Sequence, residues 1–161
     1  MSNILVACFS ATGTTKRAAK GLAEALGADT FEIVPQTPYT STDLNWSDST
    51  SRSTSEMNDE ASRPPISGTV DDMDSYDAVF VGFPIWWYTE PRIIDTFLES
   101  YDFLGKTIVP FATSGGSGLG KAPERMQRIA TGSTVAAGRL LNGHQNPNEL
   151  RDWAQRLGLM R

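Results

Sequence analysis

Short apolar runs alternate along the chain with stretches in which apolar residues recur every three or four positions. A short apolar run that ends at small polar residues or at proline is typical of a strand buried on both faces. An apolar stripe with helical spacing predicts a helix that packs one side against a sheet. We therefore expect strands at residues 4–9, 31–34, 78–83, 106–113 and 133–141, and helices at residues 14–26, 91–100, 123–130 and 148–157.

Two of the predicted strands contain a residue that conflicts with them. Pro110 lies inside the fourth strand, where a proline removes a hydrogen bond of the sheet, and a local bulge is one way to accommodate it. Gly138 weakens the fifth strand for a different reason, because glycine has no side chain to pack.

Residues 36–75 have a different composition, with many Ser, Thr, Asp and Pro residues and little periodic hydrophobicity. This composition is typical of a flexible linker. However, an unstructured stretch of this length is uncommon inside a compact domain. Residues 53–61 could form a short helix, and five apolar side chains could fix the segment in place: Tyr39, Leu44, Trp46, Met57 and Ile66.

The alternation of strands and helices predicts one domain over residues 1–161, with a parallel sheet covered by helices on both faces. Ligands of such sheets bind beyond the carboxyl ends of the strands. The residues that follow Phe9, Phe83 and Thr113 are therefore the candidates for a binding site.

Charge and cysteine content narrow the class of protein. The formal net charge of −5 and the absence of a Lys/Arg run give no support to binding of nucleic acid or anionic membranes. Cys8 is the only cysteine, so neither an internal disulfide nor a Cys/His metal cluster is expected, and a reducing cytoplasm suits the chain. We expect no membrane span and no signal peptide.

The first candidate loop follows the first predicted strand and supplies four hydroxyl groups and one glycine at the start of a helix. Free amides and the helix dipole favour an anion there, so these groups could surround a phosphate without a metal. The loop matches neither a Walker A motif nor G-x-G-x-x-G, which disfavours a nucleoside triphosphate or a dinucleotide. An ordinary capped turn is the alternative. The phosphate candidates are Ser10, Thr12, Gly13, Thr14 and Thr15.

The second candidate loop, Pro84, Ile85, Trp86, Trp87 and Tyr88, places three adjacent aromatic residues after the central strand. They could form a stacking wall for a flat ring. The alternatives are a packed loop or a surface for protein interaction.

The third candidate loop begins with Thr113, Ser114, Gly115 and Gly116 and contains four glycines up to residue 120. Glycines let the backbone approach a ligand closely, so its amides could bind a polar ring edge. A mobile hinge is the alternative. Taken together, the three loops fit a planar heterocycle with a single phosphate.

The chain resembles the flavodoxin family in residues 9–15, 81–88 and 110–118, and the resemblance extends over essentially the whole chain. It implies a doubly wound three-layer α/β/α sandwich with a five-stranded sheet in the order 2-1-3-4-5, and noncovalently bound FMN. It implies that the first loop holds the FMN phosphate and that Pro84 to Tyr88 border the isoalloxazine ring. Thr113 to Gly116 would contact the pyrimidine side and the ribityl chain. Pro110 would occupy an accepted place.

The resemblance leaves two redox roles and one non-redox role open. An electron carrier would exchange electrons with a redox partner protein, whereas a quinone reductase would take hydride from NAD(P)H and reduce a small acceptor. Many carriers have a glycine where the backbone turns near the flavin, but residues 84–91 contain none. A flavin-binding or interaction domain is the third possibility.

Other polar residues receive weaker assignments. We interpret Cys8 as a small buried residue and His144 as a surface residue, and we assign no catalytic residue. Arg52, Arg63 and Arg139 could reach an anionic substrate if residues 36–75 fold over the flavin.

Overall fold

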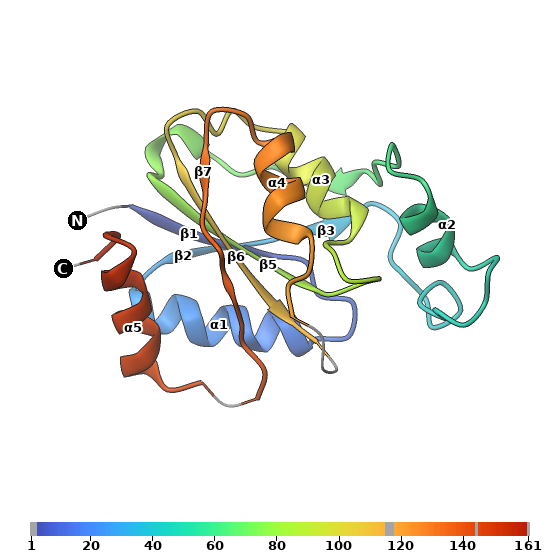
Figure 1. Cartoon of the computed structure of the whole chain (residues 1–161), viewed down its shortest axis with the longest axis horizontal. Helices are drawn as coiled ribbons and strands as arrows, with labels where there is room; N and C mark the ends of the chain where they lie inside the picture. The colour runs from blue at the N-terminus through green and yellow to red at the C-terminus, as the bar shows by residue number, and fades with distance from the viewer. Residues whose placement is uncertain (1–2, 115–117, 144, 161) are drawn as a thin grey trace.

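The computed structural model describes residues 3–114, 118–143 and 145–160, and its centre is a parallel sheet (Figure 1). Across the sheet the strands follow the order β2-β1-β5-β6-β7, and β8 continues the edge beside β6. This is the predicted order 2-1-3-4-5. The strands are β1 (Ile4–Cys8), β2 (Asp29–Glu32), β5 (Ala78–Pro84), β6 (Thr107–Thr113), β7 (Thr134–Val135) and β8 (Arg139–Leu140).

Helices cover both faces of the sheet, as the alternating pattern predicts (Figure 1). α1 (Thr14–Leu26) and α5 (Pro147–Arg156) lie on one face, and α3 (Arg92–Glu99) and α4 (Ala122–Ile129) on the other. α1 ends at Gly27, whose φ of 63° lets its amide bond back to the carbonyl of Ala23. Each of these helices lies within two residues of its predicted range.

Side chains from alternate residues of the strands pack into two apolar cores, one on each face of the sheet. Phe80 and Trp153 meet edge to face on the α1/α5 side, with ring centroids 5.3 Å apart. Burying each such side chain contributes about 1.5–3 kcal/mol. Cys8 lies in the same core, as expected, and burial raises the pKa of its thiol to about 12.

Pro110 is accommodated by an interruption in the neighbouring strand. β6 pairs with β5 in unbroken register, so no bulge forms there. On its other side, β6 pairs first with β7 and then with β8, and the chain between them turns at Gly138 with a φ of 76°. A Cβ at Gly138 would lie 2.3 Å from the carbonyl oxygen of Pro110. The prediction of one continuous strand at residues 133–141 was therefore wrong.

Residues 36–75 are ordered by local structure, and the linker interpretation was wrong. β3 (Val34–Pro35) pairs antiparallel with β4 (Ile66–Ser67), α2 (Arg52–Asn58) occupies the place of the predicted short helix, and a 3-10 turn spans Met73–Ser75. The second predicted strand likewise divides into β2 and β3. Met57 and Met73 are buried, and the side chain of Ser51 caps α2 by accepting from the amide of Thr54.

Candidate functional site

The three predicted loops follow β1, β5 and β6, which are neighbours in the sheet, so they meet at one edge. Hydrogen bonds join them. The hydroxyls of Thr15 and Thr113 are 2.8 Å apart, linking the first loop to the third. The amide of Ile85 donates to the carbonyl of Thr113 over 3.0 Å, linking the second to the third. The edge therefore behaves as one assembled surface.

The first loop has a geometry that suits an anion. Gly13 precedes α1 with a φ of 96°, and its amide donates to the Ser10 hydroxyl over 2.9 Å. This bond curls the loop ahead of the helix. The side chains of Thr12 and Thr14 are exposed, and the first turn of α1 contains no acidic residue. The first amides of a helix have no partner within it, so amides and hydroxyls are available to a phosphate.

Thr15 differs from the other phosphate candidates because it is almost fully buried. Its hydroxyl already interacts with that of Thr113. A hydroxyl can accept one hydrogen bond while donating another, so Thr15 could accept from Thr113 and donate to an anion. Its direct contact with a phosphate stays a prediction.

The second loop is a tight turn centred on Trp87 and Tyr88. The amides and carbonyls of Trp86 and Thr89 bond reciprocally, each over 3.1 Å. Both central residues have positive φ, 50° at Trp87 and 64° at Tyr88. Turns of this type usually contain Asn-Gly, because a side chain in this conformation costs about 1–2 kcal/mol. The protein therefore keeps two aromatic residues where the backbone disfavours them.

The three aromatic residues of this loop have different roles. Trp86 is half-buried and packs edge to face against Phe9 and Tyr39, with centroids 5.7 and 5.5 Å away. Trp86 thus packs against the core and also lines the cavity described below, and its contact with a ring stays a prediction. Trp87 and Tyr88, in contrast, are 42% and 70% exposed. They are the two that remain available as a stacking wall.

The third loop approaches the aromatic turn closely. The amide of Lys121 donates to the carbonyl of Tyr88 over 3.0 Å. Gly120 has a φ of 58°, and a Cβ there would lie 2.0 Å from the same carbonyl oxygen. The amide of Ser114 donates to Asn142 over 3.0 Å. Gly115 and Gly116, predicted to contact the ligand, lie outside the described residues.

A cavity of about 380 Å³ lies beside the aromatic turn. The aromatic loop forms one wall of this cavity, and the 36–75 segment, whose aromatic residues could help to form an acceptor pocket, supplies Leu44, Trp46 and Ser53. The signal for them was the presence of large apolar side chains in a polar stretch. Trp46 in particular is 77% exposed. The lining residues are Leu44, Trp46, Ser53, Ile85, Trp86, Trp87 and Tyr88.

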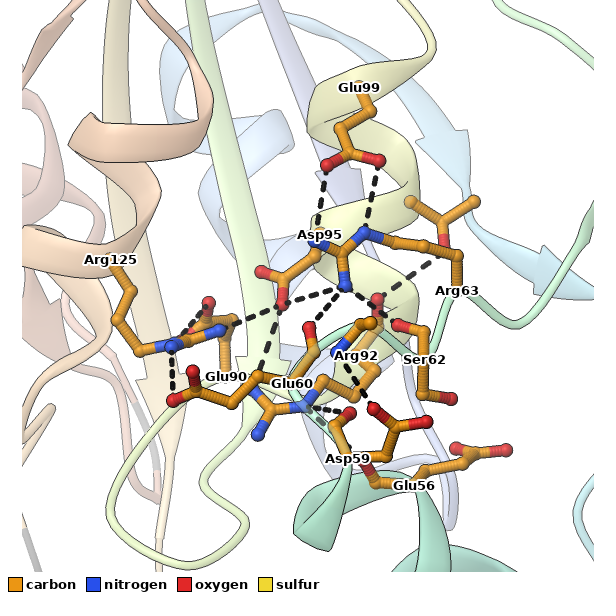
Figure 2. A network of polar contacts seen from close by, with 12 residues as sticks. Glu56, Asp59, Glu60, Ser62, Arg63, Glu90, Arg92, Asp95, Glu99 and Arg125 are labelled. Atoms are coloured by element: carbon orange, nitrogen blue, oxygen red, sulfur yellow. Dashed lines mark hydrogen bonds and ion pairs between the residues drawn. The ribbon is translucent and has the colours of Figure 1, made fainter.

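A buried charge network follows the aromatic turn and was not predicted (Figure 2). Glu90 and Asp95 are fully buried. Arg125 donates to both carboxylates, with N–O distances of 3.4 Å to Glu90 and 3.3 Å to Asp95, and also bonds Glu60 over 3.1 Å. Arg63 adds a longer ion pair to Asp95 at 3.9 Å. α3, α4 and the 36–75 segment are joined through these groups.

The network holds a carboxyl group with strongly altered acidity. Burial raises the pKa of Asp95 to about 8, and the hydrogen bond and negative charge of Glu90 act in the same direction. Two adjacent buried carboxylates are costly when both are ionised. We therefore expect Asp95 to hold a proton over much of the neutral range.

Arg92 connects this network to α2. Its Nε donates to the carbonyls of Glu56 and Asp59, each over 3.2 Å, and its Nη2 donates to that of Met57 over 2.8 Å. These carbonyls lie at or just beyond the end of α2, and those of Glu56 and Asp59 also accept from the backbone amides of Asp59 and Ser62. The side chain therefore fixes α2, and with it part of the cavity wall.

The arginines proposed for an anionic substrate already have protein partners. Arg52 lies over the ring of Tyr39, 3.8 Å from its centroid, and pairs with Glu56. Arg63 makes two hydrogen bonds to Glu99, and Arg139 lies over Trp153. They do not form a common site.

The described part of the chain offers neither a metal centre nor a membrane-spanning helix. Within it, no group of three or more His, Cys, Asp and Glu side chains is placed to hold a metal ion. Among its helices, none combines the length and the apolar character needed to cross a membrane.

Comparison with known proteins identifies the family of the chain. A profile described as flavodoxin matches residues 3–157. The structure is similar to a provisionally named flavoprotein from Bacteroides eggerthii DSM 20697, with 46% identity, coverage of 98% of this chain and 99% of that one, and a TM-score of 0.91. A second from Bacteroides uniformis ATCC 8492 has 47% identity, coverage of 96% and 98%, and a TM-score of 0.89.

A more distant structure shares the fold alone. It is a flavoprotein from Lactobacillus acidophilus NCFM in complex with FMN, with 20% identity, coverage of 96% of this chain and 99% of that one, and a TM-score of 0.74. No curated protein matches the sequence.

Proposed function

The chain belongs to the flavodoxin family, and we propose that it is a flavoprotein that binds FMN noncovalently and acts in redox chemistry. One observation carries the proposal. A helix start suited to a phosphate and an exposed aromatic turn with an apolar cavity occupy the same sheet edge. The FMN in the Lactobacillus acidophilus flavoprotein adds support from a relative of the same fold.

The residues divide between the two ends of the cofactor. Ser10, Thr12 and Thr14 would bind the phosphate through hydroxyls and loop amides, with Gly13 shaping the loop and Thr15 donating from below. At the other end, the exposed side chains of Trp87 and Tyr88 would border the ring. Backbone amides after Thr113 would meet the polar ring edge. Bound FMN supplies the capacity to take up and release electrons.

A specific observation favours a second, narrower candidate, reduction of a small acceptor such as a quinone at the expense of NAD(P)H. Reciprocal hydrogen bonds hold the turn between Trp86 and Thr89, and residues 84–91 contain no glycine. A peptide flip beside the flavin, as in many carriers, would therefore meet resistance. The cavity beside the turn also offers room for an acceptor.

Titration of the apo-protein with FMN, followed by quenching of flavin fluorescence, tests the proposal. We expect saturable one-to-one quenching with the wild-type protein. In the double variant Thr12→Ala/Thr14→Ala the affinity for FMN should fall by about 100-fold or more, because each hydrogen bond to a charged group contributes roughly 1.5–3 kcal/mol. Thr69→Ala/Thr131→Ala, which alters two exposed threonines elsewhere, is the matched control. Absence of saturable quenching would refute FMN binding.

Anaerobic reduction separates the two roles. We expect NADPH to bleach the bound flavin by two electrons, with little one-electron-reduced flavin during stepwise chemical reduction. Large accumulation of the one-electron-reduced form would instead identify a carrier that serves a redox partner protein.

A further inference from the structure

A second cavity, of about 490 Å³, shares Trp87 and Tyr88 with the apolar one but has a different character. Four cationic side chains line it, Arg92, Lys121, Arg125 and Arg128, together with a single carboxylate, Glu60. The whole chain has only fourteen Lys and Arg residues and a net charge of −5. Positive charge is therefore concentrated at this cavity against the general balance of the molecule.

Two of these cations are free to bind a ligand. Lys121 and Arg128 are exposed, and neither side chain forms an ion pair within the described residues. They extend from the start of α4 and from its last turn. Arg92 and Arg125 are held in place by the network of Figure 2, where Glu90 and Asp95 pair with them, so the unpaired positive charge at this cavity belongs to Lys121 and Arg128.

The one carboxylate at this cavity is easily displaced. Glu60 bonds Arg125 through a side chain that is 80% exposed. Exposed ion pairs of this kind contribute little to stability. An incoming oxyanion could therefore replace Glu60 at Arg125, while Lys121 and Arg128 approach it from the rim. Arg125 would offer only its Nη1, because its Nε and Nη2 donate to Glu90 and Asp95. The unpaired guanidinium of Arg128 can bind an oxyanion through two parallel hydrogen bonds.

We propose that this basic cavity binds the oxyanion, a carboxylate, sulfonate or phosphate, of a small planar aromatic substrate whose ring enters the neighbouring apolar cavity. Trp87 and Tyr88 line both cavities, so the two cavities are neighbours at the aromatic turn. The inference rests on the proposed function, since it names the class of acceptor that would meet the flavin.

Calorimetric titration of FMN-loaded and apo-protein with 9,10-anthraquinone-2-sulfonate tests the proposal, with uncharged 2-(hydroxymethyl)anthraquinone as the comparison ligand. In the double variant Lys121→Gln/Arg128→Gln we expect the Kd for the sulfonate to rise about tenfold or more and the Kd for the uncharged ligand to change less than about twofold. Added salt should weaken binding of the sulfonate to the wild-type protein but not binding of the uncharged ligand. Lys20→Gln/Arg156→Gln removes the same charge from exposed sites elsewhere and should bind like wild type.

The backbone bond from Lys121 to Tyr88 survives the substitution, so the turn should keep its shape. Arg128→Glu gives a second, single-residue test with the same expected direction. Equal sulfonate affinity in wild type and in both variants would overturn the proposal. The apo-protein keeps the two ideas separable: loss of FMN binding refutes the proposed function, while sulfonate binding to the apo-protein still tests the basic cavity.

Discussion

The two faces of the sheet differ in where their charged side chains lie. On the α1/α5 face the core is apolar, and the ion pairs of its helices lie at the surface, as with Lys16 and Glu32 or Asp152 and Arg156. On the α3/α4 face an equally apolar core adjoins the buried charges of Glu90 and Asp95. The candidate ring site and the basic cavity both lie beside the second face.

This difference teaches how the site is positioned. Apolar packing tolerates exchange among side chains of similar volume. A buried charge network tolerates little, because removing one member leaves another unpaired. Such a network adds little to the overall stability of the protein, but it specifies one arrangement of α2, α3 and α4. Through Arg92 it fixes the segment that carries Trp46.

The largest expected effect comes from breaking the network. Arg92→Met should lower the free energy of unfolding by about 3–5 kcal/mol, because it removes a buried cation that pairs with Asp95 and three hydrogen bonds to backbone carbonyls. Leu22→Met on the other face, a change of similar volume, should cost less than about 1.5 kcal/mol. Urea denaturation measures both. The comparison of the two faces fails if the two variants are equally stable.

The second prediction concerns pH. The pKa of Asp95 rises from 3.8 to about 8 on folding, so between these pH values the folded state binds more protons than the unfolded state. The contribution of this proton to the free energy of unfolding is therefore fully present below about pH 4 and is lost as the pH rises through 8. The slope is at most about 1.4 kcal/mol per pH unit, and the nearby arginines reduce it. Asp95→Asn should remove this slope from urea midpoints measured between pH 4 and 8. An unchanged slope in the variant would contradict the assignment.

The smallest expected effect has the opposite sign. Tyr88→Gly should stabilise the protein by about 1 kcal/mol, because it relieves a positive φ at a side chain that is 70% exposed. FMN binding should weaken in the same variant if the ring stacks there. Thermal unfolding and FMN titration on one preparation measure both, and a destabilised variant would show that the turn is not strained.

Local patterns predicted most of the fold. The apolar runs of β1, β5 and β6 and the stripe of α1 are legible in the sequence because their periodicity is strong. In the 36–75 segment only the short helix was predicted, because the polar residues of this segment bond one another and leave little periodic hydrophobicity. Ser51 and Thr54, for example, are buried through mutual hydrogen bonds around the start of α2.

The candidate site was predictable only where its residues are adjacent in the chain. The hydroxyl-rich loop and the aromatic turn are continuous stretches, so their composition indicates a binding role. The charge network and the basic cavity assemble from residues far apart in the chain; Glu60 and Arg125, for example, bond across 65 positions. Glu90 and Arg125 look like ordinary surface charges until the fold buries them.

The burial of Cys8 has a practical consequence. A thiol reacts with alkylating reagents as the thiolate, and a pKa near 12 in a closed core leaves almost none at neutral pH. The native protein is therefore chemically silent toward maleimides. A cysteine introduced at position 46 would be the only reactive thiol, and a dye attached there would report the approach of any molecule to the cavity.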